Sequence, residues 1–201
     1  MSFAEVDYHL FQYINQLSNN LSFLNPMMCN LATKAEYVFY LGVVVYWFTR
    51  QKANRDMVAK SLLSASIALG LSGMLGHFFY RDRPFVTHEV LQLIPHPANA
   101  SFPSDHATAA FAIAASIWMY RRKAGTFWFV LAASIAFSRV WTGVHYVSDV
   151  MAGAIIGISV AWTVHQLSHR YGWLSKGLNG IIHVYEHVES KIWHRKETKQ
   201  G

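Results

Sequence analysis

Five stretches of the chain are long and apolar enough to cross a bilayer, and this feature limits the fold more than any other. A spanning helix needs about 20 mostly apolar residues, and only helices or closed barrels satisfy their backbone in hydrocarbon. The stretches are Met27–Phe48, Met57–Tyr80, Phe102–Tyr120, Thr126 to about Trp141, and about Val147 to Leu167. The last carries Gly153 and Gly157 at the GxxxG spacing, which favours either a close helix pair or general small-residue packing. The sequence predicts an all-α polytopic transmembrane bundle of five spans.

Amphipathic segments flank these spans on both sides. Val6–Leu24 has apolar residues at helical spacing, which predicts an interfacial helix at the outer surface. A sixth span is the competing interpretation, and the Asn and Gln residues of this segment disfavour it. Ser175–Trp193 is expected on the inner surface, and the polar His194–Gly201 is expected to be disordered. The expected layout of this single domain is an interfacial helix over 1–26, a transmembrane core over 27–167, and a cytoplasmic amphipathic and basic tail over 168–201.

The distribution of charge indicates the class of protein and its orientation. Only 14% of residues are charged and 53% are hydrophobic, whereas a soluble domain has about 25% charged residues. The net charge of +6 could suggest a nucleic-acid partner, but the basic residues form short clusters between apolar runs and no continuous face. These clusters follow the first, third and fifth spans. Alternation places them on one side, which the positive-inside rule makes cytoplasmic.

Polar residues concentrate at the opposite, outer ends of the spans. The clusters are Arg81-Asp82-Arg83-Pro84, Pro103-Ser104-Asp105-His106, and a third that runs from Ser138-Arg139 through His145 to Asp149. Ionisable groups next to hydrocarbon are costly, so their default interpretation is functional. The predicted topology brings all three clusters to one membrane face.

The first group of these side chains suits an oxyanion. Arg83 and Arg139 present planar donors that match phosphate oxygens, and Ser104 adds a hydroxyl. A helix that starts near Asp105 would also direct its free amides and positive dipole end outward. These features predict a phosphate cradle without a metal. Asp105 itself favours the helix start, and Arg81 is either a further phosphate ligand or a residue that extends to the interface.

The second group suits phosphoryl transfer. His145 and Asp149 are four residues apart, so they share a helix face. The carboxylate can fix one ring nitrogen and leave the other as a nucleophile. His106 can protonate the leaving oxygen. Each residue alone could be structural, and it is the combination that indicates phosphatase chemistry.

The three clusters together resemble the three-part signature of the type-2 phosphatidic acid phosphatase superfamily, which includes membrane lipid phosphatases and soluble vanadium haloperoxidases. The matching parts are Arg83-Pro84, Pro103-Ser104-Asp105-His106 and Ser138-Arg139-x5-His145-x3-Asp149. The resemblance implies that His145 is the nucleophile, His106 the acid and Asp149 its orienting partner. It also implies three phosphate ligands, namely Arg83, Ser104 and Arg139, and no metal or other cofactor.

The first motif departs from the superfamily pattern. Its usual lysine would fall at Gly76, so one cationic phosphate ligand is missing. Arg81 could replace that lysine. Alternatively, Lys34 or Glu36, near the outer end of the first span, could shape the pocket differently.

A longer stretch is similar to the bacitracin-resistance type of undecaprenyl-diphosphatase within this superfamily. It comprises Arg83–Val86, His88, Leu93–His96 and Ser101–His106. The similarity implies an enzyme that hydrolyses the C55 lipid diphosphate on the outer face of a bacterial plasma membrane. Such an enzyme recycles the carrier lipid for cell-wall synthesis and confers bacitracin resistance. His88 and His96 are expected to shape the loop more than to act in catalysis, and His96 is a candidate pocket residue.

Other functions stay open at this point. A phosphate cradle does not distinguish C55 diphosphate from phosphatidylglycerophosphate, phosphatidate or a shorter prenyl diphosphate. A transporter or a non-enzymatic anion-binding membrane protein is a different class, but transporters tend to place polar groups near the midplane. The expected partners are the lipid substrate and membrane lipids, without nucleic acid. The sequence leaves the oligomeric state open.

Overall fold

The computed structural model describes the backbone of residues 1–197 and the side chains of residues 1–192. Within this part of the chain all regular structure is helical. The elements are α1 (Phe3–Asn20), the 3-10 turn η1 (Ser22–Leu24), α2 (Asn25–Lys34), α3 (Glu36–Phe48), α4 (Lys52–Phe78), α5 (Pro84–Thr87), α6 (Asp105–Tyr120), α7 (Arg122–Trp141), α8 (Val147–Arg170) and α9 (Gly172–Glu197). The all-α prediction is confirmed.

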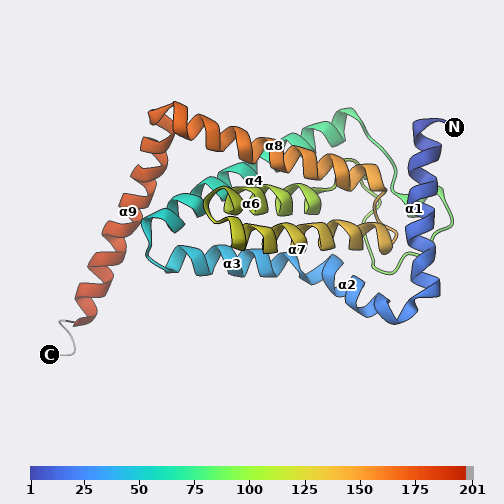
Figure 1. Cartoon of the computed structure of the whole chain (residues 1–201), viewed down its shortest axis with the longest axis horizontal. Coiled ribbons are helices and arrows are strands. Elements are labelled where there is room, and N and C mark those ends of the chain that lie inside the picture. The colour runs from blue at the N-terminus through green and yellow to red at the C-terminus, as the bar shows by residue number, and fades with distance from the viewer. Residues whose placement is uncertain (198–201) are drawn as a thin grey trace.

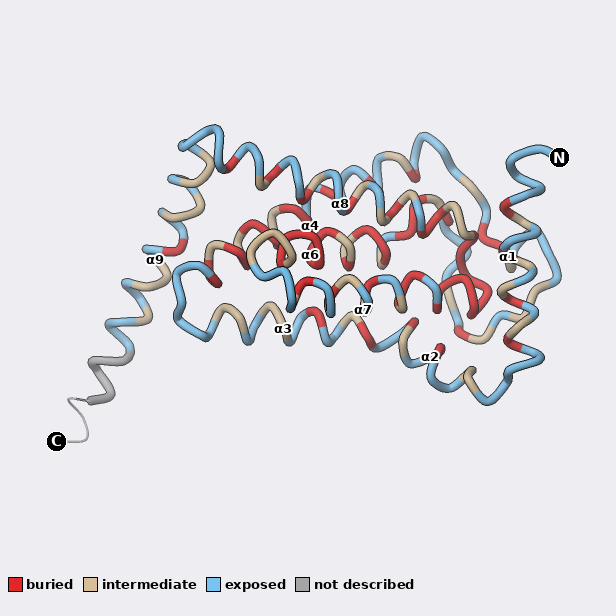
Figure 2. The backbone as a smooth tube through the Cα atoms, viewed as in Figure 1, coloured by how far each residue is buried: buried red, intermediate tan, exposed pale blue. Residues whose placement is uncertain are grey.

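Helix α6 lies at the centre of the bundle, against α4, α7 and α8 (Figure 1). Its alanines are buried except Ala109, and Figure 2 shows the buried positions gathered on α6 and on the sides of the helices that face it. A Cβ atom on Gly153 or Gly157 of α8 would lie 2.7 Å from the Ser104 carbonyl oxygen or 2.4 Å from that of Thr108. The GxxxG spacing therefore serves a close α6–α8 contact.

The first predicted span, Met27–Phe48, is broken. It consists of α2 and α3, which meet at Ala35. The break releases carbonyl groups at the end of α2, and Arg139 Nη1 donates to the carbonyl oxygen of Ala32 at 2.8 Å. A charged donor from α7 thus replaces an internal helix hydrogen bond.

The number of spans remains a prediction. Three helices are long and apolar enough to cross a membrane within the described residues, namely α4, α7 and α8. Helix α3 is apolar but shorter, at 13 residues. Helix α6 has 16 residues and is the central, most enclosed element.

Helices α1 and α9 lie across opposite ends of the bundle (Figure 1). The predicted interfacial helix Val6–Leu24 corresponds to α1 and η1, with α1 starting at Phe3. Arg55 of α4 holds α9 through Glu186 and Glu189, at 2.9 and 2.6 Å. The prediction that order ends at His194 is wrong for residues 194–197, because their backbone continues α9. Residues 198–201 lie outside the described part of the chain.

Candidate active site

The predicted site residues meet at the end of the bundle that α1 covers. Arg81 and Arg83 follow α4, Ser104 and His106 begin α6, and the turn between α7 and α8 supplies His145. The start of α6 is fixed to α8, because the Ser104 amide donates to the Asp149 carbonyl oxygen at 3.1 Å. Segments far apart in the sequence are therefore joined at one point.

The nucleophile candidate is paired as expected. His145 Nδ1 lies 3.5 Å from Asp149 Oδ2, and both residues are buried. The Asp149 carboxylate also accepts from the Tyr146 amide at 2.8 Å and from the Ser101 hydroxyl at 2.5 Å. The first of these bonds belongs to the N-terminal cap of α8, so helix capping fixes the carboxylate. An oriented carboxylate fixes the imidazole in turn.

The contacts of His145 define its protonation state. Arg83 Nη1 lies 3.0 Å from His145 Nε2, and a guanidinium can only donate. Nε2 must therefore accept, which leaves the proton on Nδ1 toward Asp149. Burial lowers the pKa of His145 to about 4, with Arg83 and Arg139 adding to that effect and Asp149 opposing it. The ring is neutral near pH 7, with a lone pair on Nε2.

Arg83 is buried within the loops of this end. Its guanidinium donates to Asn99 Oδ1 at 3.0 Å and to the carbonyl oxygens of Val144 and Ala100 at 2.9 and 3.1 Å. Burial lowers the pKa of Arg83 below its usual value, yet arginine remains charged under ordinary conditions. The cation is held rigidly beside the nucleophile.

Arg139 and Ser104 carry unused donors. Arg139 Nε and Nη2 and Ser104 Oγ are buried without a hydrogen-bond partner among the described residues. Only Nη1 of Arg139 is bonded, to the Ala32 carbonyl oxygen. Buried polar groups are rarely left unpaired, because each costs about 1–3 kcal/mol or more when charged. This arrangement is suited to an oxyanion that supplies the missing acceptors.

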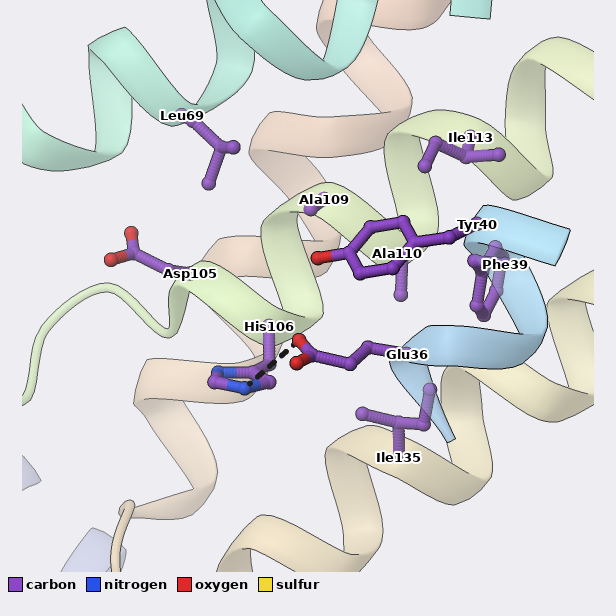
Figure 3. Close-up of a pocket in the computed structure, with 10 residues that line it drawn as sticks. All are labelled: Glu36, Phe39, Tyr40, Leu69, Asp105, His106, Ala109, Ala110, Ile113 and Ile135. Atoms are coloured by element: carbon purple, nitrogen blue, oxygen red, sulfur yellow. Dashed lines mark ion pairs between the residues drawn. The ribbon is translucent and has the colours of Figure 1, made fainter. Parts of the chain in front are cut away.

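His106 lies beside a cavity of about 300 Å³ (Figure 3). Its Nε2 is 3.4 Å from Glu36 Oε2, which extends from the first turn of α3. The rest of the lining is largely apolar and comprises Phe39, Tyr40, Leu69, Asp105, Ala109, Ala110, Ile113 and Ile135. The Asp105 carboxylate points away from the His106–Glu36 pair (Figure 3) and accepts from Ser72 Oγ at 2.7 Å. The cavity thus joins an ionisable end to an apolar wall.

Several candidates do not lie with the unused donors. Arg81 Nη1 contacts Asp7, Ser148 and Asp149 Oδ1, whereas His145 contacts the other carboxylate oxygen of Asp149. Lys34 is exposed at the end of α2 and does not line the cavity. A Cβ atom on Gly76 would lie 3.0 Å from the Phe102 carbonyl oxygen, so close backbone packing occupies the position of the missing lysine.

The loop histidines have different surroundings. The His96 ring centroid lies 6.2 Å from that of His145, and burial lowers the pKa of His96. His88 instead stacks on Tyr8 of α1, with centroids 4.0 Å apart. His96 therefore borders the site, whereas His88 attaches the loop to α1.

Sequence reasoning missed Ser101 and Asp7 as site residues. Ser101 lies within the stretch Ser101–His106, but its contact with Asp149 depends on how the loop folds. Asp7 is one of two acids on an amphipathic helix, with Glu5, and the sequence does not show that Asp7 is buried. Within residues 1–192 no three His, Cys, Asp or Glu side chains are placed to hold a metal ion.

Comparisons with known proteins agree with this arrangement. A sequence model of the PAP2 superfamily matches residues 57–173. The chain is 39% identical over 197 residues to the bacitracin transport permease protein BcrC of Bacillus licheniformis, covering 96% of this chain and 93% of that protein. It is 29% identical over 196 residues to the undecaprenyl-diphosphatase BcrC of Bacillus subtilis strain 168, covering 98% and 100%. The crystal structure of Aquifex aeolicus LpxE superposes with a TM-score of 0.64 at 26% identity, covering 79% of this chain and 94% of that one.

Proposed function

Because this chain belongs to the PAP2 superfamily, we propose that it hydrolyses undecaprenyl diphosphate to undecaprenyl phosphate through a phosphohistidine at His145. The unpaired buried donors of Arg139 and Ser104 carry this proposal. They lie at the same end of the bundle as a neutral imidazole whose lone pair is held on Nε2. A terminal phosphate would supply the acceptors that the folded protein lacks.

The first half of the reaction forms the covalent intermediate. His145 Nε2 attacks the terminal phosphorus in line, and the bond from phosphorus to the bridging oxygen breaks. The nearby Asp149 carboxylate stabilises the positive charge that develops on the imidazole. His106 donates a proton to the departing lipid monophosphate. Arg83, Arg139 and Ser104 stabilise the charge on the equatorial oxygens.

The second half releases phosphate. His106, now neutral, removes a proton from a water molecule that attacks the phosphohistidine. The bond between phosphorus and Nε2 breaks, and inorganic phosphate leaves. His145 returns to its neutral form with the proton on Nδ1. Positioning and charge stabilisation by these side chains account for the rate in this scheme.

The cavity next to His106 supports a lipid substrate. Its apolar wall is formed by α3, α4, α6 and α7, so a prenyl chain could lie there with its diphosphate toward His106. The name of the Bacillus subtilis relative supports the C55 diphosphate as the substrate. The name of the Bacillus licheniformis relative supports an additional role in bacitracin resistance. The positive-inside rule supports a site on the extracytoplasmic face of a bacterial plasma membrane, because it makes the opposite end of the bundle cytoplasmic.

One relative is named as a transport permease. Transporters place their substrate site near the bilayer midplane, on interrupted helices. Here the ionisable residues cluster at one end of the bundle, around a histidine–carboxylate pair. This geometry favours hydrolysis over transport.

Phosphate release by purified protein tests the proposal. The panel is C55 and C15 prenyl diphosphates, phosphatidylglycerophosphate and phosphatidate, with and without EDTA. The highest kcat/KM is expected for the C55 diphosphate, unchanged by EDTA, and His145→Ala is expected to abolish it. His183→Ala, at an exposed position on α9, is the matched control. Faster turnover of a glycerophospholipid would change the substrate, and substantial activity in His145→Ala would refute the mechanism.

A further inference from the structure

A buried acid on the N-terminal helix contacts the catalytic turn. Asp7 of α1 is 4% exposed, although α1 is otherwise an amphipathic surface helix. Its Oδ1 accepts from the Ser148 amide at 2.9 Å, and its Oδ2 accepts from the Ser148 hydroxyl at 2.5 Å. Ser148 lies in the first turn of α8, next to Asp149. A carboxylate here stabilises the positive end of the helix and fixes its first turn.

Arg81 connects this acid to Asp149. Its Nη1 lies 2.7 Å from Asp7 Oδ2 and 3.3 Å from Asp149 Oδ1, and it donates to Ser148 Oγ at 2.8 Å. The guanidinium also lies over the Tyr146 ring, with its central carbon 3.6 Å from the ring centroid. The two carboxylates therefore share one cation that an aromatic face holds in place.

Charge balance explains why both residues are needed. Asp7 and Asp149 are buried carboxylates that face the same cation, and two such anions without it would repel and favour protonation. A protonated Asp149 would accept a weaker hydrogen bond from His145 Nδ1. Without Asp7, in turn, Arg81 would lose its closest anionic partner and its fixed direction.

We propose that Asp7 and Arg81 are positioning residues that keep Asp149 charged and aligned on His145. Arg81 thereby supports the nucleophile through Asp149 and does not replace the missing phosphate-binding lysine. Helix α1 becomes a working part of the active site, although it lies outside the residues 57–173 that define the superfamily match. This inference rests on the proposed function.

The test separates positioning from phosphate binding. For Arg81→Ala we expect kcat to fall about tenfold or more, as for other residues that orient a catalytic ligand, while KM and inhibition by vanadate stay within about twofold. Added guanidinium ion should restore part of kcat. Asp7→Asn should also lower kcat, and the double variant should lose less than the product of the two single effects.

The matched control is Asp82→Asn, since Asp82 is exposed and has no ion pair among the described residues. It should keep the kcat of the unmodified protein. If Arg81→Ala does not fold, Arg81→Lys and Asp7→Asn decide the matter through the same split between kcat and KM. Thermal unfolding in detergent identifies a variant that is merely unstable.

Two results would overturn the inference. If Arg81→Ala raises KM and weakens vanadate inhibition with kcat intact, Arg81 is a phosphate ligand. If Arg81→Lys and Asp7→Asn both keep full kcat, the network has no catalytic role. His145→Ala distinguishes these from a failure of the proposed function, because turnover that survives in His145→Ala refutes the mechanism itself.

Discussion

Arg139 shows how a single side chain can indicate a ligand. Two of its guanidinium nitrogens are buried without acceptors, while the third is used to bridge the break between α2 and α3. A buried, partly unpaired cation destabilises the ligand-free protein. The residue is therefore best explained by an anion that binds beside it.

Replacing Arg139 should separate ligand binding from folding. We expect orthovanadate to raise the unfolding temperature of the unmodified protein, since a ligand that binds only the folded state stabilises it. In Arg139→Met this shift should disappear and kcat/KM should fall by about 100-fold or more. The unfolding temperature without vanadate should change little, because removal of an unpaired charge offsets loss of the hydrogen bond to the Ala32 carbonyl oxygen. A variant that kept the full vanadate shift would contradict the proposed cradle.

For single residues, the sequence predicts which side chains take part in the chemistry but not which side chains they contact. Spacing predicts that Asp149 lies near His145, but the predicted shared helix face is wrong, because His145 lies in the turn before α8 and only Asp149 is helical. It cannot show that Arg81 faces Asp7 and Asp149, because that contact joins three segments far apart in the chain. It also cannot show that Glu36 reaches His106.

The close contact between α6 and α8 is the main determinant at the scale of elements. Ser104 and His106 begin one of these helices, and Asp149 lies in the first turn of the other. The distance between the two halves of the site therefore depends on the small residues between the helices. Gly157 is the tightest of these positions, 2.4 Å from a backbone oxygen if a Cβ is added.

Gly157→Ala should consequently impair both stability and turnover. The added methyl group would push α6 away from α8, at a cost of about 1–3 kcal/mol. Gly70→Ala is the matched control, since nothing lies within 4 Å of the added atom in α4. Thermal unfolding and kcat in the same detergent would check this. Equal behaviour of the two variants would show that α6 and α8 are not packed as described.

Element boundaries were predictable where a local signal marks them. Pro103 and Asp105 mark the start of α6, and Asp149 marks the start of α8. The break at Ala35 carries no comparable signal, because Thr33–Glu36 contains neither glycine nor proline. It depends on Arg139, which only the folded bundle brings to Ala32.

Two kinds of polar cluster lie at opposite ends of the molecule. The end covered by α1 holds the candidate catalytic histidines and the unpaired groups of Arg139 and Ser104. The opposite end holds Arg55, which pairs with Glu186 and Glu189 and fixes α9. On α9 an apolar stripe remains exposed, made of Ile181, Val184, Val188 and Ile192. A helix of this kind across the end of a bundle is suited to the membrane interface.

The two ends should lie on opposite sides of the membrane. In a Cys29→Ser background, a cysteine at exposed Glu89 should react with an impermeant thiol reagent in intact cells. A cysteine at exposed Ser190 of α9 should react only after permeabilisation. The reverse pattern would place the active site in the cytoplasm and contradict the positive-inside assignment.

Trapping the covalent intermediate tests the central claim most directly. Undecaprenyl diphosphate labelled in its terminal phosphate is mixed with purified protein, quenched in alkali within the first turnover, and digested for mass spectrometry. The account predicts label on the peptide that contains His145, bound through the imidazole, and none in His145→Ala. Turnover without a labelled protein, or label on another residue, would contradict it.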